Sequence, residues 1–200
     1  MNTPIRKSAL RRYLVFRVKA IEMMDLNILY QAVASGKMDI ANPAGRLPQD
    51  FSDSLRTPLL SWFALLIDND GLDVIELWAE LFPRLKNDIE TTRARIQPAW
   101  QIIREFRDRA GFHTDKPRPF FLARHQVIAN QETLAKALED FRKLFLTILE
   151  AEPSELPDLE QEADEFLDAL ESELHCNYDR GEVKRYLMIR SAPSPASGKA

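Results

Sequence analysis

Apolar residues recur along most of the chain at the three- and four-residue spacing of amphipathic helices. The first pattern covers residues 5–34 and ends at Gly36, and a loop over residues 36–49 leads to a second pattern that begins at Phe51. A short third pattern follows the turn signal at Asn69-Asp-Gly71. Because no stretch alternates with a period of two for long enough to make a sheet, the pattern predicts an all-α protein.

The longest unbroken pattern covers residues 84–112. Its register continues across Pro98, which predicts one long kinked helix rather than two separate helices. The apolar positions of this pattern form a seam, a row along one face of the helix. Such a seam packs against another helix, either in the same subunit or in a partner, and the sequence leaves both possibilities open. The apolar positions recur at alternating gaps of four and three residues: Leu85, Ile89, Thr92, Ile96, Ala99, Ile103, Phe106 and Ala110.

Two further helical patterns follow a proline-containing loop. One covers about residues 131–151, with Asn130 as a candidate N-cap. The other covers about residues 154–175, opens at Ser154 and carries a dense row of acidic side chains on its polar face. The core of the protein is therefore expected to be a bundle of five to six helices.

The end of the chain differs in composition from the rest. Residues 182–190 suit a short helix or strand, and residues 191–200 have the Ser-, Pro- and Ala-rich composition of a disordered tail. The sequence thus predicts a helical bundle over residues 1–151, followed by an acidic helix with a short extension over residues 152–190 and then by the tail.

The composition is that of an ordinary globular protein, with 45% hydrophobic and 29% charged residues among 200. The longest apolar runs are much shorter than the ~20 residues of a membrane span. Basic residues near the N-terminus interrupt every candidate signal-peptide core. The single cysteine excludes an internal disulfide framework. We therefore expect a cytoplasmic protein, with no membrane association, metal or cofactor.

The net charge of −4 hides an asymmetry along the chain. Residues 5–19 carry six Lys or Arg and no acid, residues 84–124 carry ten basic against five acidic side chains, and residues 139–175 carry thirteen acidic against two basic. Two interpretations follow. The basic segments can offer a positive surface to a nucleic acid, or the basic and acidic helices can neutralise each other within the fold.

The densest group of candidate catalytic side chains lies over residues 104–115, where the longest helical pattern ends. Extending that register places His113 on the apolar seam, and Arg109, four residues earlier, shares its face. Arg107 reaches the same side only if the helix unwinds near Gly111, which glycine permits.

Arginine and histidine without a convergent nucleophile suit metal-independent cleavage of RNA. A histidine can take the proton from a ribose 2′-hydroxyl, and a guanidinium can stabilise the extra charge on the phosphate. One histidine supplies either the base or the acid, so a second copy of the chain would complete the set. The candidate catalytic residues are Arg107, Asp108 and His113, and the candidate phosphate contacts are Arg104, Arg109, Arg118 and Arg124.

At these residues the chain resembles the HEPN superfamily of small all-helical proteins, which includes abortive-infection and toxin-type endoribonucleases of prokaryotes. The hallmark of that family is an Arg directly followed by a polar residue and, a few residues later, by a His. Arg107-Asp108-Arg-Ala-Gly-Phe-His113 fits this hallmark with five intervening residues, and the likeness covers about residues 5–150.

The resemblance implies a metal-independent ribonuclease that forms a homodimer with its two motifs face to face. It assigns Arg107 to stabilisation of the phosphate, His113 to general acid–base catalysis and Asp108 to the role of polar partner. Arg118 and His125 also satisfy the spacing loosely, but a proline occupies the polar position between them.

Two alternatives remain for the same features. The basic cluster can be a solvated helix end stabilised by the helix dipole. The chain can also be a non-catalytic interaction protein, an antitoxin or scaffold, whose acidic helix covers a basic partner. The tryptophans are interpreted as core residues rather than as base-stacking platforms. His175-Cys176 lacks a second ligand pair at metal-binding spacing and is interpreted as a solvated helix end.

Overall fold

The described part of the chain is helical throughout, apart from the turns that join or end its helices, and it contains no strand. This confirms the predicted all-α class for that part of the chain. The protein is represented here by a computed structural model. The model describes residues 3–37, 59–60, 63, 74–110, 125–174 and 179–188, with the side chains of residues 3–5, 107–110 and 174 outside the described set.

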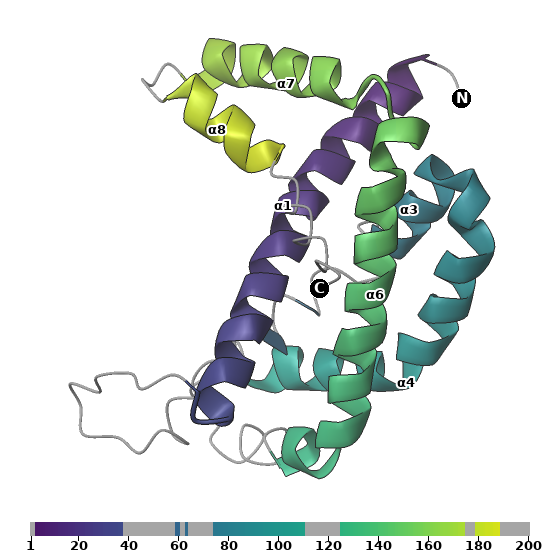
Figure 1. Ribbon diagram of the computed structural model, residues 1–200, viewed down its shortest axis with the longest axis vertical. Helices are drawn as coiled ribbons and strands as arrows, with labels where there is room; N and C mark the ends of the chain where they lie inside the picture. Colours follow the sequence, from purple (N-terminus) through teal and green to yellow (C-terminus); the bar gives the residue numbers. More distant parts are fainter. Residues whose placement is uncertain are drawn as a thin grey trace, which may run out of the picture.

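Figure 1 shows the arrangement of these helices. Helix α4 packs along α6, α3 packs against both α1 and α4, and α7 and α8 lie across the N-terminal half of α1. The elements in chain order are α1 (Thr3–Ala34), α3 (Val74–Leu81), the 3₁₀ helix η1 (Pro83–Leu85), α4 (Lys86–Ala110), α6 (Gln131–Glu155), α7 (Leu159–Leu174) and α8 (Arg180–Leu187).

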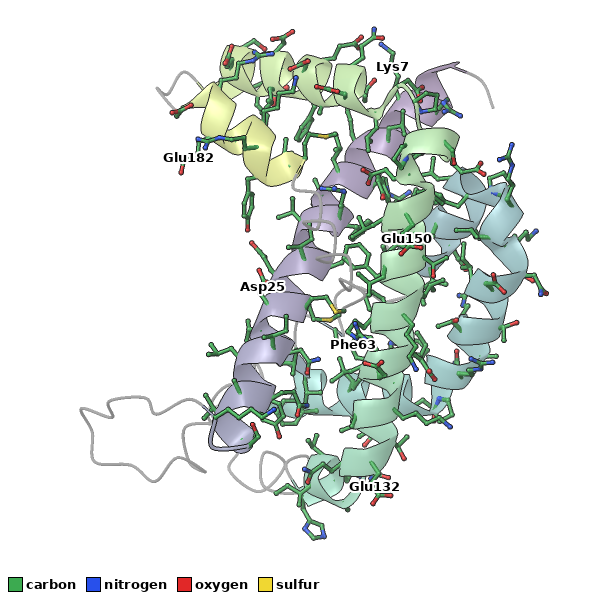
Figure 2. All side chains as sticks on the ribbon, in the orientation of Figure 1. Lys7, Asp25, Phe63, Glu132, Glu150 and Glu182 are labelled. Carbon is green, nitrogen blue, oxygen red and sulfur yellow. The ribbon has the colours of Figure 1, made fainter. Side chains whose placement is uncertain are left out.

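Aromatic side chains from several helices form the centre of the core. Trp78 of α3 is fully buried and stacks on Phe145 of α6, with ring centroids 5.9 Å apart. Phe63 meets Phe141 edge to face at 5.4 Å and lies between α1 and α6 (Figure 2). Each such pair contributes about 0.5–1.5 kcal/mol beyond the burial of its area. The interpretation of Trp78 as a core residue is confirmed.

Helix α1 ends where the sequence predicts. Gly36 adopts a φ of 68°, a left-handed conformation that glycine adopts without steric cost. The chain then folds back on the helix, because the Gly36 amide donates to the Val33 carbonyl and the Lys37 amide to the Ala32 carbonyl, each at 3.0 Å.

The register of the longest pattern is confirmed in α4. Its predicted seam residues from Ile89 to Phe106 are buried, and the seam packs against α6, so the contact is made within the subunit. Pro98 lies inside this single helix. Figure 1 shows α4 changing direction along its length, as the missing amide of a proline causes.

The predicted boundary between the last two long helices is wrong. Helix α6 continues to Glu155 with Pro153 inside it, and α7 begins at Leu159 rather than at Ser154. The Ser154 hydroxyl donates to the Ala151 carbonyl of α6 and caps no helix. The helix continues because of a tertiary contact: Glu152 in the last turn of α6 is buried and accepts hydrogen bonds from Tyr13 and Arg17 of α1.

The structure also tests the predictions for the N-cap at Asn130 and for the segment over residues 182–190. Asn130 stands at the N-cap of α6, but its side chain makes no capping bond and its amide donates to the Gln126 carbonyl at 2.7 Å. The segment after Gly181 is a helix rather than a strand. Asp179 caps it by accepting a hydrogen bond from the Glu182 amide at 2.9 Å.

The division of the chain at residues 151 and 152 stays a prediction, although α6 crosses that point without a break. The expected tail over residues 191–200 lies outside the described residues, as do most of the second helical pattern and His175-Cys176.

Candidate functional site

The end of α4 carries the predicted ribonuclease motif in part. The helix is continuous to Ala110, so positions 104, 107 and 108 have the i, i+3, i+4 spacing that makes neighbours on a helix surface. The side chains of residues 107–110 are not among those described, and His113 lies outside the described residues. Whether the guanidinium and the imidazole meet therefore stays a prediction.

Arg104 is the one predicted site residue whose side chain the structure describes. It is exposed, and its guanidinium carbon lies 5.6 Å from the centre of the Trp100 ring. A cation over an exposed aromatic face gains about 0.5–1 kcal/mol. Trp100 itself is half-buried against the core, so it holds the guanidinium at the surface one turn before position 107.

The other candidate phosphate contacts lie beyond the described helices. Arg118 and Arg124 fall outside the described residues, and the side chain of Arg109 is among those not described. His125, which opens the helical segment over residues 125–129, is exposed.

The basic segment of α1 faces the acidic helix α7. The Arg6 guanidinium binds the Asp158 carboxylate at 2.8 Å, and the Arg11 guanidinium binds Glu162 at 2.6 Å. Figure 2 shows Lys7 beside α7, where its ammonium lies 2.5 Å from a Glu165 oxygen. These three pairs show that the basic and acidic segments neutralise each other within the fold.

Helix α8 supplies further cations to α7. Arg180 binds Asp168 at 2.5 Å and Glu171 at 3.3 Å, and Lys184 binds Asp164 at 2.8 Å and Glu160 at 3.5 Å. Together with the partners from α1, these contacts engage six acidic side chains of α7.

These pairs shift the ionisation of the acids. The hydrogen bond from Arg6 lowers the pKa of Asp158, and the hydrogen bond from Lys7 lowers the pKa of Glu165. In the same way Lys184 lowers the pKa of Asp164. These three carboxylates therefore stay ionised to lower pH than free carboxylates would.

A buried polar cluster of Tyr13, Arg17 and Glu152 was missed by the sequence analysis. The Tyr13 hydroxyl and the Arg17 Nε both donate to the same Glu152 oxygen, each at 2.7 Å. Arg17 Nη1 also donates to the Leu187 carbonyl of α8 at 2.7 Å. Tyr13 and Arg17 are 0% exposed and Glu152 is 3% exposed.

The ionisation of this cluster suits a structural role. Burial raises the pKa of the Tyr13 phenol well above its usual value, and the charge of Glu152 raises it further, so the hydroxyl stays a donor. The cluster joins α1, α6 and α8 in the core, where a substrate has no access.

A signal for this cluster exists in the sequence. Arg17 lies three residues after Leu14 on the buried face of α1, and Glu152 lies four residues after Ile148 on the buried stripe of α6. A charge in register with apolar residues predicts a buried partner. The sequence does not say which charge pairs with which.

The described segments contain neither a candidate membrane span nor a candidate metal cluster. No helix there is both long and apolar enough to cross a membrane. Nor do three or more His, Cys, Asp or Glu side chains converge as ligands for a metal ion in those segments.

No family model, curated protein or solved structure matches the chain. The likeness to the HEPN superfamily therefore depends on the motif over residues 107–113 and on the helical class of the fold. Any function proposed for the chain has to be argued from its own residues.

Proposed function

We propose that the protein is a metal-independent endoribonuclease of the HEPN type, acting in prokaryotic defence or in a toxin–antitoxin system. The observation that supports this most is the course of α4. One continuous helix leads from the core to Arg107 and Asp108, and Arg104 stands exposed one turn earlier. Exposed arginines are common contacts of nucleic acid phosphates, which supports this part of α4 as the proposed binding region.

The distribution of charge supports the same location. The cations of α1 at positions 6, 7 and 11 are bound to acids of α7 or, for Arg6, to Asp158 just before that helix. A backbone phosphate would have to displace a carboxylate to bind them. The segment over residues 104–124 carries six basic against three acidic side chains in the sequence, which favours it as the region of contact with RNA.

The proposed reaction needs only side chains of this chain. His113 takes the proton of a ribose 2′-hydroxyl, and the 2′-oxygen attacks the adjacent phosphorus while the bond to the 5′-oxygen breaks. Arg107 stabilises the charge that develops on the phosphate oxygens. The departing 5′-oxygen takes a proton from His113 of a second copy in a homodimer. The products are a 2′,3′-cyclic phosphate and a 5′-hydroxyl.

A cleavage assay in EDTA tests this proposal. The wild type should cut an end-labelled mixed-sequence RNA, and Arg107→Ala should cut it at least about a hundredfold more slowly, as expected when a preorganised charge is removed from a transition state. Arg95→Ala is the matched control, because Arg95 is an exposed arginine three turns earlier on the same helix. Equal rates for all three proteins would exclude Arg107 from the reaction.

The alternative function, an interaction protein that covers a basic partner with its acidic helix, has less support. Six acidic side chains of α7 already bind Lys or Arg of the same chain. A basic partner would have to compete with these internal pairs.

A further inference from the structure

A cavity of about 240 Å³ lies between α1 and α6 at the end of the bundle away from α7. In Figure 2 this is the end of α6 that carries Glu132. Both helices contribute residues at i, i+3, i+4 and i+7, so each presents one straight stripe to the cavity. The stripes are Asn27, Tyr30, Gln31 and Ala34 on α1, and Gln131, Leu134, Ala135 and Leu138 on α6.

The two walls of the cavity differ in chemistry. The α1 wall is polar but uncharged, with two carboxamides and the phenol of Tyr30. The opposite wall and the floor are mainly aliphatic, with Leu134 and Leu138 joined by Leu59, Leu60 and Val127, all of them buried. None of the described lining residues carries a charge.

We propose that this cavity binds a small uncharged amphiphile with an apolar body and an amide-like edge. The apolar body would lie against the leucines, and its edge would exchange hydrogen bonds with Asn27 and Gln31, because carboxamides both donate and accept. The volume is below the about 300–1,000 Å³ of pockets for drug-sized molecules, so the ligand is smaller than those. This inference does not depend on the proposed ribonuclease activity.

The lining sets the selectivity. A carboxylate or an ammonium that bound there would lose part of its hydration and meet no opposite charge among the described lining residues, which is unfavourable. An amide of the same length loses less hydration and regains hydrogen bonds at the α1 wall. The cavity should therefore prefer neutral ligands over both kinds of ion.

The selectivity can be measured with three probes of equal length on the full chain: N-hexylacetamide, octanoate and a straight-chain alkylammonium. Ligand-observed NMR titration should show binding of the amide, with the two ions at least about tenfold weaker, which is about 1.4 kcal/mol. Failure of the amide to bind, or equal binding of the amide and an ion, would overturn the proposal.

The location can be tested by filling the cavity from its rim. Ala34 and Ala135 are both exposed and both line the cavity, so Ala34→Phe and Ala135→Phe should each abolish binding of the amide without unfolding the protein. Ala94→Phe is the matched control at an exposed alanine of α4 and should bind as the wild type does. Unchanged binding in both rim variants would overturn the assignment.

A measurement on the wild type does not depend on how well the variants fold. The amide should shift the ring resonances of Tyr30, which are identified by their absence from the spectrum of Tyr30→Phe. Binding that leaves those resonances unmoved would place the amide elsewhere and contradict the proposal.

Discussion

Arg17 of α1 and Arg104 of α4 have the same charge but differ in how far they are buried and in the groups beside them. On α1, Arg17 is fully buried against Glu152, whereas the partly exposed Arg6 and Arg11 bind Asp158, just before α7, and Glu162 of α7. On α4, Arg104 is exposed and lies over the ring of Trp100. Local charge density in the sequence therefore does not distinguish a buried structural cation from an exposed candidate binding residue, whereas the burial of the side chain does.

The comparison also ranks the ion pairs by energy. A pair of exposed charges contributes about 0–1 kcal/mol, because water screens it and both side chains lose freedom. Breaking a buried pair by removing one partner costs more, because the other charge stays buried without compensation. The cluster around Glu152 should therefore dominate the electrostatic contribution of the C-terminal helices to stability.

The largest expected effect on stability is that of Glu152→Ala. It leaves the Arg17 guanidinium buried without its carboxylate and should lower the free energy of unfolding by about 3–5 kcal/mol, measured by urea denaturation. Glu150→Ala is the matched control, at an exposed glutamate of the same helix (Figure 2), with an expected effect within about 0.5 kcal/mol. Similar losses in the two variants would contradict the proposed importance of burial.

A double variant tests whether the uncompensated charge is the cause. Arg17→Met combined with Glu152→Met removes both charges and replaces them with apolar side chains. It should be more stable than Glu152→Met alone, since pairs of buried charges can often be replaced by apolar groups at little cost. A double variant less stable than Glu152→Met would show that the hydrogen bond from Arg17 to the Leu187 carbonyl matters more than the charge.

A smaller loss is expected for Tyr13→Phe. This change removes one hydrogen bond to the Glu152 carboxylate and leaves the bond from Arg17 in place. The loss should be about 1–3 kcal/mol, in the range for a bond to a charged group, and is measured by the same denaturation experiment. No change in stability would mean that the hydroxyl does not stabilise the ionised carboxylate.

The ion pairs at the surface predict that the stability of the protein depends on pH. The pKa values of Asp158 and Glu165 are lowered in the folded state by Arg6 and Lys7. The stabilisation is complete above the ordinary pKa values of 3.8 and 4.5 and is lost as the pH falls through the lowered values. The melting temperature should therefore decrease when the pH is lowered below about 4.

Asp158→Asn provides the control for this pH dependence. It should lower the melting temperature slightly at pH 6, where Asp158 is ionised in the wild type, and should reduce the drop between pH 6 and pH 3. An identical pH profile for the variant and the wild type would show that the pair with Arg6 contributes nothing to stability.

The smallest effect on stability is expected for Arg104→Ala. Loss of an exposed cation over Trp100 should change the free energy of unfolding by about 1 kcal/mol or less. Its effect on RNA should be clearer, with weaker binding and a shallower dependence of affinity on salt, measured by fluorescence anisotropy at several salt concentrations. Unchanged RNA affinity would remove Arg104 from the candidate interface.

The helices were predictable where one face of a helix is buried in the core. The seam of α4 alternates in steps of three and four residues because this face is buried, with α6 and α3 packed against the helix, and the sequence reports that directly. The end of α6 was not predictable in the same way. Pro153 and Ser154 resemble the start of a helix locally, but the hydrogen bonds that Glu152 accepts from Tyr13 and Arg17 of α1 keep the chain in α6.

The buried cluster of Tyr13, Arg17 and Glu152 was not predictable from local sequence patterns either. Arg17 and Glu152 are 135 positions apart, and no feature near either one identifies the other. For the candidate site, the sequence supplied the motif residues, and the structure adds the continuous helix up to position 110 and the exposed Arg104. The meeting of Arg107 with His113 stays a prediction.

The most direct test of the proposed ribonuclease is cleavage in EDTA of an RNA and of the same sequence with 2′-deoxyribose at the cleaved position. The wild type should convert the RNA into products with 2′,3′-cyclic phosphate and 5′-hydroxyl ends and leave the deoxy substrate intact. His113→Ala should cleave the RNA at least about a hundredfold more slowly. Cleavage of the deoxy substrate by the wild type, or of the RNA by His113→Ala at the wild-type rate, would contradict the proposal.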